Sequence, residues 1–155
     1  MLEAEGVDVD FVQDNLSLSL DIGTVRGLHC QLPPHAQAKL VRCPRGRLFD
    51  VAVDIRMGSP RFGQWIAEEL SAENGKQLFI PAGFLHGFIT LEANTEIMYK
   101  CSDYYAPDCD VSVRFDDPDI SIDWLIETAW AILSEKDDAA LRFADFQSPY
   151  VYEAP

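Results

Sequence analysis

The sequence carries few positive charges and no long apolar run. Its 12 lysine and arginine residues stand against 26 acidic residues, which gives a formal net charge of −14. This balance repels nucleic acids and anionic membrane surfaces at long range. The opening MLEAEGVDVD is acidic, whereas a signal peptide starts with a basic stretch and continues with an apolar one. We therefore expect a cytoplasmic protein that binds neither nucleic acid nor membrane.

Cysteine is scarce, and the four cysteines form no C-x-x-C pair. This spacing favours neither a zinc knuckle nor a disulfide framework, so reduced thiols are expected at Cys30, Cys43, Cys101 and Cys109. Apolar residues nevertheless make up 48% of the 155 residues, which is sufficient for a hydrophobic core. We expect one domain over residues 1–155.

Short segments of β-type composition recur along the chain, separated by turn signals such as Pro33-Pro34 and Asn74-Gly75. This spacing predicts an all-β sandwich or barrel. In RLFDVAVDI, apolar residues at positions 49, 51, 53 and 55 predict a strand with one buried face. The segment CPRGR just before it predicts a tight hairpin with KLVRC.

A helical pattern occurs only near the end of the chain. Ile126, Trp130 and Leu133 follow one another at spacings of four and three. Ser134 then precedes several acidic residues, which is typical of a helix N-cap. We expect a short helical segment after the sandwich.

Positive charge concentrates in residues 24–61, which hold seven lysines and arginines against two acids. Most of these side chains fit solvated strand faces, but the region can also accept a small anion. Arg26 and His29 lie three positions apart in VRGLHCQ and would face opposite sides of a regular strand. Gly27 permits a bulge that turns both side chains toward one pocket.

The three histidines, His29, His35 and His86, suggest two kinds of chemistry. PAGFLHGF fits P-x-G-x-x-H, the second metal motif of cupin barrels, but the H-x-H of the first motif is missing. The sequence therefore disfavours a metal. A strand histidine can instead act as a general base when a carboxylate orients it, and Asp137 is the candidate. The alternative is a packed core histidine.

Nine segments occur in the same order as the motifs of the dTDP-4-dehydrorhamnose 3,5-epimerase family, which the chain resembles over roughly residues 11–124. They are FVQDN, VRGLH, HAQAKLVR, GRLFDVAVDIR, GSPRFGQW, LSAEN, QLFIPAGFLHGF, MYKCSDYYAP and DDPDISIDW. The resemblance implies a jelly-roll (cupin-like) enzyme without metal or other cofactor, usually a homodimer. Its substrate would be a nucleotide-linked 4-keto-6-deoxyhexose.

The resemblance also implies roles for individual residues. His29 resembles the base, Asp137 its orienting carboxylate, with Asp138 as second choice, and Tyr99 the acid on the opposite face. Lys39 is similar to the cation near the C4 oxygen, where enolate charge develops. Residues similar to the family's substrate-binding positions are Arg26, on the diphosphate side, and Gln13, Asn15, His86, Tyr105, Asp110 and Lys136.

Several of these positions also fit purely structural roles. Tyr99 shares strand parity with Ile97 and so fits a core tyrosine. Tyr105 fits a strand end, and Asp110 a solvated loop. The family's usual front segment, of the form F-x-D-x-R-G-x-F, is missing, and Cys30 replaces an aromatic residue. A non-catalytic sugar-nucleotide-binding relative and a metal-dependent cupin enzyme therefore remain alternatives.

Overall fold

The computed structural model describes residues 6–154, and nearly all of its regular structure is β-sheet. The strands in chain order are β1 (Gln13–Ser19), β2 (Val25–Gln31), β3 (Lys39–Arg45), β4 (Arg47–Asp54), β5 (Trp65–Ser71), β6 (Gln77–Ile80), β7 (Phe84–Thr90), β8 (Thr95–Cys101) and β9 (Asp110–Ser112). The helix α1 (Glu135–Asp138) and the 3₁₀ turns η2 (Pro107–Cys109), η3 (Thr128–Trp130) and η4 (Phe143–Asp145) complete the list.

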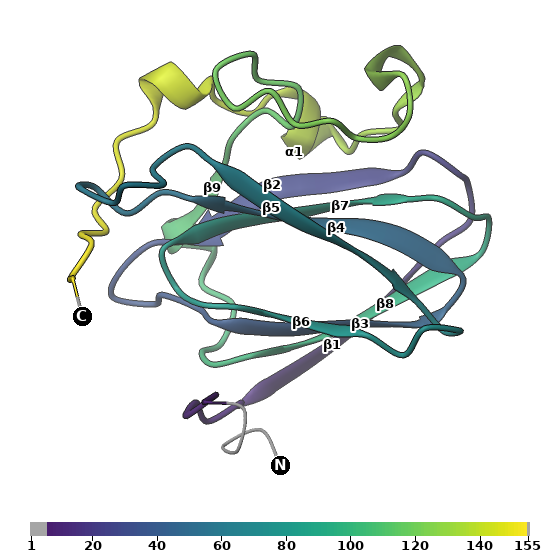
Figure 1. Cartoon of the computed structure of the whole chain (residues 1–155), viewed down its shortest axis with the longest axis horizontal. Coiled ribbons are helices and arrows are strands. Elements are labelled where there is room, and N and C mark those ends of the chain that lie inside the picture. The colour runs from purple at the N-terminus through teal and green to yellow at the C-terminus, as the bar shows by residue number, and fades with distance from the viewer. Residues whose placement is uncertain (1–5, 155) are drawn as a thin grey trace.

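The strands form two stacked antiparallel sheets. The four-stranded sheet has the order β1-β8-β3-β6, and the five-stranded sheet has the order β5-β4-β7-β2-β9. Figure 1 shows the two sheets as separate layers, with the green and yellow C-terminal segment above the five-stranded sheet. The expected all-β jelly-roll fold is confirmed.

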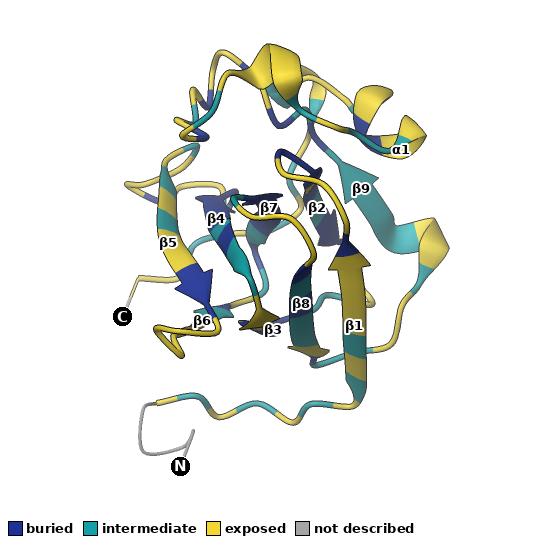
Figure 2. Cartoon of the chain, turned by 90° about the vertical axis from the view of Figure 1, so that its right-hand side faces the viewer, coloured by how far each residue is buried: buried dark blue, intermediate teal, exposed yellow. Residues whose placement is uncertain are grey.

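The inner strands of the five-stranded sheet are buried on both faces. Leu48 and Ala52 of β4 pack in the cluster between the sheets, whereas Val51 and Val53 pack in a second cluster that includes Trp124. The prediction that RLFDVAVDI has one buried face is therefore wrong. The C-terminal segment covers the outer face, which a pattern within β4 cannot reveal. Figure 2 shows β2 and β7 in the buried colour and β1 largely exposed.

The expected hairpin between KLVRC and RLFDVAVDI does not form. β3 pairs with β6 and β8, while β4 pairs with β5 and β7 in the other sheet. Gly46 makes the corner between them with a φ of 76°, and a Cβ there would lie 2.4 Å from the hydroxyl of Thr95. The tight turn therefore carries the chain from one sheet to the other.

The predicted helical pattern over Ile126, Trp130 and Leu133 is also wrong, since only η3 and the four-residue α1 form there. The backbone N–H of Ile132 donates to Gly23 and its carbonyl accepts from Val25, which holds this stretch extended along β2. Ser134 does cap α1, because its hydroxyl accepts a hydrogen bond from the backbone N–H of Asp137 at 3.1 Å. Within residues 6–154, the helices are all too short or too polar to cross a bilayer.

Candidate active site

Two adjoining pockets contain most of the predicted site residues. The larger has a volume of about 420 Å³ and the smaller about 260 Å³. His29, Lys39 and Tyr99 line both pockets and therefore stand where the two meet. The larger pocket is also lined by Gln13, Asn15, Tyr105 and Asp110, and the smaller by Arg26 and His86.

A bulge in β2 points Arg26 and His29 into the same pocket, as expected. The pairing between β2 and β7 shifts register between these two residues, and Gly27 has a φ of 124°. A Cβ at Gly27 would lie 2.6 Å from the Cα of Gly87, so a side chain does not fit there. Glycine is thus required both for the backbone conformation and for the close approach of the two strands.

His29 hydrogen-bonds through Nε2 to the Oδ1 of Asp137, whose side chain is fully buried. Burial alone would raise the pKa of Asp137, but hydrogen bonds from His29, Ser134 and the Gly27 backbone hold this pKa below its usual value. The carboxylate stays ionised at neutral pH and can only accept, so Nε2 carries a proton, and in the neutral imidazole Nδ1 is then the nitrogen with the free lone pair. Asp138 is exposed, and the carboxylate that reaches His29 belongs to Asp137.

Tyr99 and Lys39 come from the sheet opposite to His29. Tyr99 lies on β8 and Lys39 on the neighbouring β3, with the Lys39 Nζ 5.8 Å from the centre of the Tyr99 ring. Burial raises the pKa of the Tyr99 phenol and lowers the pKa of the Lys39 ammonium. The phenol therefore keeps its proton at neutral pH, and the ammonium becomes a stronger proton donor.

A second histidine–carboxylate pair lies beside the smaller pocket, which its histidine lines. His86 lies opposite His29 in the register of β2 and β7, and its Nε2 is 2.7 Å from the Oδ1 of Asp50. Asp50 is fully buried, and its Oδ2 has no hydrogen-bond partner among the residues described. Arg26 is exposed and donates to the carbonyl of Val25 at 3.0 Å. Arg26 and the two imidazoles therefore line one polar pocket.

The far end of the larger pocket is polar and partly exposed. The Gln13 amide donates to the Oδ1 of Asn15 at 3.0 Å, and the Asn15 amide lies 3.6 Å from the Cys101 sulfur. The Tyr105 hydroxyl is 3.4 Å from Asp110, which also pairs with Lys136. Lys136 is thus held at this end through Asp110.

Sequence reasoning missed several residues of the two pockets. Cys30, Gln31, Gln37 and Cys101 line the larger pocket, and Ser17 and Phe88 line the smaller. The sequence did hold a signal for two residues: Gln31 shares strand parity with His29, and Asp50 interrupts the apolar residues in the middle of a strand. The remaining residues depend on how the two sheets face each other.

The histidines do not converge on one point. The Nδ1 of His35 lies 3.1 Å from Asp103 in a surface loop, whereas His29 and His86 pair with other carboxylates. Within residues 6–154, the histidine, cysteine and acidic side chains form no group of three or more that could hold a metal ion.

Comparison with known proteins identifies close relatives. The family model described as dTDP-4-dehydrorhamnose 3,5-epimerase matches residues 1–145. A protein of that name from Sinorhizobium fredii is 54% identical over 145 residues, covering 94% of this chain and 74% of the relative.

Solved structures agree with this match. The dTDP-6-deoxy-D-glucose-3,5-epimerase of Legionella pneumophila, in complex with dTDP-4-keto-L-rhamnose, has a TM-score of 0.91 at 45% identity and covers 98% of this chain and 80% of that one. The dTDP-4-dehydrorhamnose 3,5-epimerase of Bacillus anthracis, with TDP and PPi bound, has a TM-score of 0.88 at 46% identity. It covers 92% of this chain and 80% of that one.

Proposed function

The chain belongs to the dTDP-4-dehydrorhamnose 3,5-epimerase family, and we propose that it inverts C3, C5 or both in a dTDP-linked 4-keto-6-deoxyhexose. It is an isomerase, as its curated relatives are. Those relatives favour catalysis over a role in binding alone. Both carbons flank the C4 ketone, so removal of a proton from either gives an enolate.

One observation carries the assignment of residues: His29 and Tyr99 line the same pockets from opposite sheets. Inversion requires a base on one face of the sugar and an acid on the other. His29 takes the proton from carbon, and Tyr99 returns a proton to the opposite face. Both side chains then exchange protons with solvent, so the reaction balances with protons alone.

Asp137 and Lys39 support the charges that develop during the reaction. The buried Asp137 carboxylate stabilises the imidazolium that forms when His29 accepts a proton. Lys39, which lines both pockets with the base and the acid, donates to the C4 oxygen as it becomes an enolate. Such a donor has a larger effect in a site that excludes water than it has in solution.

The remaining predicted residues bind the substrate outside the reacting carbons. We assign Arg26 to the diphosphate, His86 to the sugar, and the polar end of the larger pocket to the nucleoside. That end comprises Gln13, Asn15, Tyr105, Asp110 and Lys136. The complexes of two relatives, with dTDP-4-keto-L-rhamnose and with TDP, support a nucleotide-sugar ligand.

Deuterium exchange tests the function directly. Incubation with dTDP-4-keto-6-deoxyglucose in D₂O should introduce deuterium at C3 or C5. The variant His29→Ala should abolish exchange and keep dTDP binding, because the base acts only in the reaction. Folded protein without exchange would refute the function, and equal loss of exchange and binding would refute the role of His29.

We also propose that the protein is a cytoplasmic homodimer. β1 is an edge strand of the four-stranded sheet, and its Leu16 and Leu18 side chains are 61% and 50% exposed. An exposed edge with apolar side chains is a common place for a second chain to bind. The four cysteines are free, which suits a reducing compartment.

A further inference from the structure

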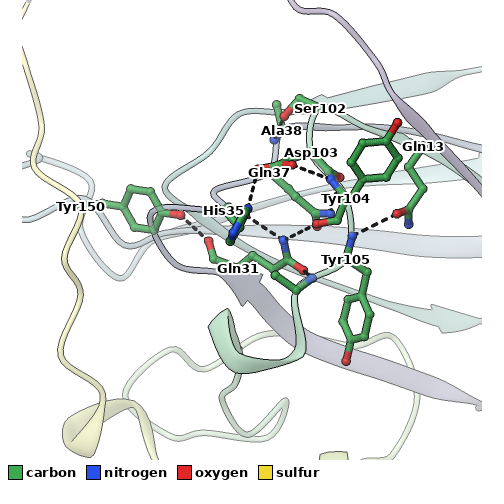
Figure 3. Close-up of polar contacts among 11 residues, drawn as sticks. Gln13, Gln31, His35, Gln37, Ala38, Ser102, Asp103, Tyr104, Tyr105 and Tyr150 are labelled. Carbon is green, nitrogen blue, oxygen red and sulfur yellow. Dashed lines mark hydrogen bonds and ion pairs between the residues drawn. The ribbon is translucent and has the colours of Figure 1, made fainter.

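One buried amide, that of Gln31, holds the loop that ends the larger pocket. Gln31 is the last residue of β2 and is 3% exposed. Its Nε2 donates to the carbonyls of His35 at 2.8 Å and Tyr104 at 3.2 Å, and its Oε1 accepts from the backbone N–H of Ala106 at 2.7 Å (Figure 3). Both N–H groups of the amide are therefore used on backbone carbonyls.

A second glutamine fixes the residue between these contacts. The backbone N–H of Tyr105 donates to the Oε1 of Gln13 at 3.0 Å, as Figure 3 shows. Three consecutive residues, from Tyr104 to Ala106, are thus held through their backbone by two side chains. Gln13, Gln31 and Tyr105 all line the larger pocket.

These contacts matter because the Tyr105 side chain has little packing of its own. Tyr105 is 58% exposed and lies in an irregular stretch between β8 and η2. Its position therefore depends on where the backbone is held, together with the contact of its hydroxyl to Asp110 at 3.4 Å. A wall that is ordered before the ligand arrives lowers the entropy that binding must remove.

Other contacts tie the same loop to the turn after β2. The Gln37 amide donates to the Asp103 carbonyl at 2.7 Å, and His35 pairs with the Asp103 carboxylate. The Tyr150 hydroxyl donates to the backbone carbonyl of Gln31, so the C-terminal segment anchors the centre of the network. The Gln31 side chain contacts both segments, the turn after β2 at His35 and the loop after β8 at Tyr104 and Ala106.

We propose that Gln31 is a positioning residue that orders Tyr105 as a wall of the nucleoside end of the site. This inference rests on the proposed function, which places the nucleoside at Tyr105. Gln31 acts through Tyr105, so its loss should weaken nucleotide binding and leave proton transfer at His29 largely intact.

The variant Gln31→Glu removes both amide donors and keeps the acceptor for Ala106. Gln147→Glu is the matched control, because it adds the same charge at an exposed glutamine. We expect the Kd for dTDP and the KM to rise about tenfold in Gln31→Glu, which corresponds to ~1.4 kcal/mol. The kcat should stay within about twofold of the wild type.

Amide hydrogen exchange of the free protein separates positioning from direct contact with the ligand. Faster exchange at Tyr105 and Ala106 in Gln31→Glu without ligand would support positioning. Unchanged exchange at Tyr105 and Ala106 in Gln31→Glu would overturn the proposal. An equal loss of dTDP affinity in Gln147→Glu, or a fall in kcat at constant KM in Gln31→Glu, would also overturn it.

If Gln31→Glu does not fold, Gln31→Met fills similar space without charge and should give the same pattern of exchange and dTDP binding. The dTDP and hydrogen-exchange measurements do not require turnover. Absence of deuterium exchange in the wild type would therefore refute the proposed function separately from the role of Gln31.

Discussion

His29 and Asp137 lie 108 positions apart in the sequence, and a hydrogen bond joins their side chains in the wall of the site. The carboxylate arrives on α1, which Ser134 caps, and the imidazole arrives on β2 just after the bulge at Gly27. The base and its orienting group are thus supplied by two independently positioned segments.

Replacement of Asp137 by asparagine should lower kcat by about 10²- to 10⁴-fold, the usual contribution of a general base. The amide keeps the shape of the carboxyl but cannot stabilise an imidazolium. Steady-state kinetics would measure the change, with KM near the wild-type value because Asp137 is buried behind His29. Asp138→Asn, at an exposed neighbour, serves as control. A wild-type kcat in Asp137→Asn would contradict this role.

Tyr99→Phe should separate proton exchange from inversion. Without the phenol, His29 can still remove a proton and return it, or a solvent deuteron, to the same face. We expect deuterium incorporation to continue while formation of the inverted sugar falls by about 10²-fold or more. Proton NMR of the product in D₂O measures both. Equal loss of exchange and inversion would mean that Tyr99 is needed for proton removal too.

Asp50→Ala should destabilise the protein, because it leaves the buried Nε2 of His86 without its partner. Loss of one member of a buried hydrogen-bonded pair costs about 1–3 kcal/mol. The free energy of unfolding in urea would measure this cost. Asp50→Asn retains a group that can hydrogen-bond His86 and should recover most of the stability. Equal stability of Asp50→Ala and wild type would show that the pair contributes nothing.

Arg56→Ala should lower the free energy of unfolding at pH 7 by about 1–2 kcal/mol, a value reduced for partial exposure of the arginine. Arg56 pairs with the buried Asp54 at 2.7 Å and lies over the rings of Phe84 and Tyr152. Arg61→Ala removes the same charge from an exposed residue of the next turn and is the control.

The effect of Arg56→Ala should depend on pH. Burial raises the pKa of Asp54, but Arg56 and Ser59 bring it below its ordinary value of 3.8. A lowered pKa in the folded state means that the ion pair stabilises the protein above pH 3.8, and that this contribution is lost as the pH falls through the folded pKa. Urea titrations at pH 7 and at successively lower pH, as far as the protein stays folded, should show the difference shrink below pH 3.8. If the difference in unfolding free energy between wild type and Arg56→Ala stays constant with pH, the arginine stabilises the protein only through its contacts with the rings of Phe84 and Tyr152.

The exposed leucines of β1 provide a test of the dimer. Light scattering should give the mass of two chains for the wild type and of one chain for Leu16→Glu combined with Leu18→Glu. The two glutamates would be desolvated and without ion-pair partners in a buried interface, which disfavours association. Leu125→Glu, at another exposed leucine, should remain a dimer. A wild-type mass of one chain would refute the proposal.

Much of the architecture is encoded locally. The alternation of apolar residues and the turn signals identify a β protein, and Gly27 between Arg26 and His29 permits the bulge. Ser134 before acidic residues likewise identifies the cap of α1. The strands, the bulge and the cap each depend on the backbone preferences of a few neighbouring residues, and the sequence alone determines those preferences.

The tertiary structure decided what depends on distant partners. CPRGR specifies a tight turn, but whether β3 pairs with β4 depends on β6, β7 and β8, which follow later in the chain. The second buried face of β4 exists because residues beyond Phe115 pack on it, and Ile132 is extended because it pairs beside β2. Likewise Gln31 and Cys101 line the site because the two sheets stack, and Asp50 contacts it only through His86. A sequence pattern records which side of a strand a residue occupies, and only the packed fold determines what lies opposite.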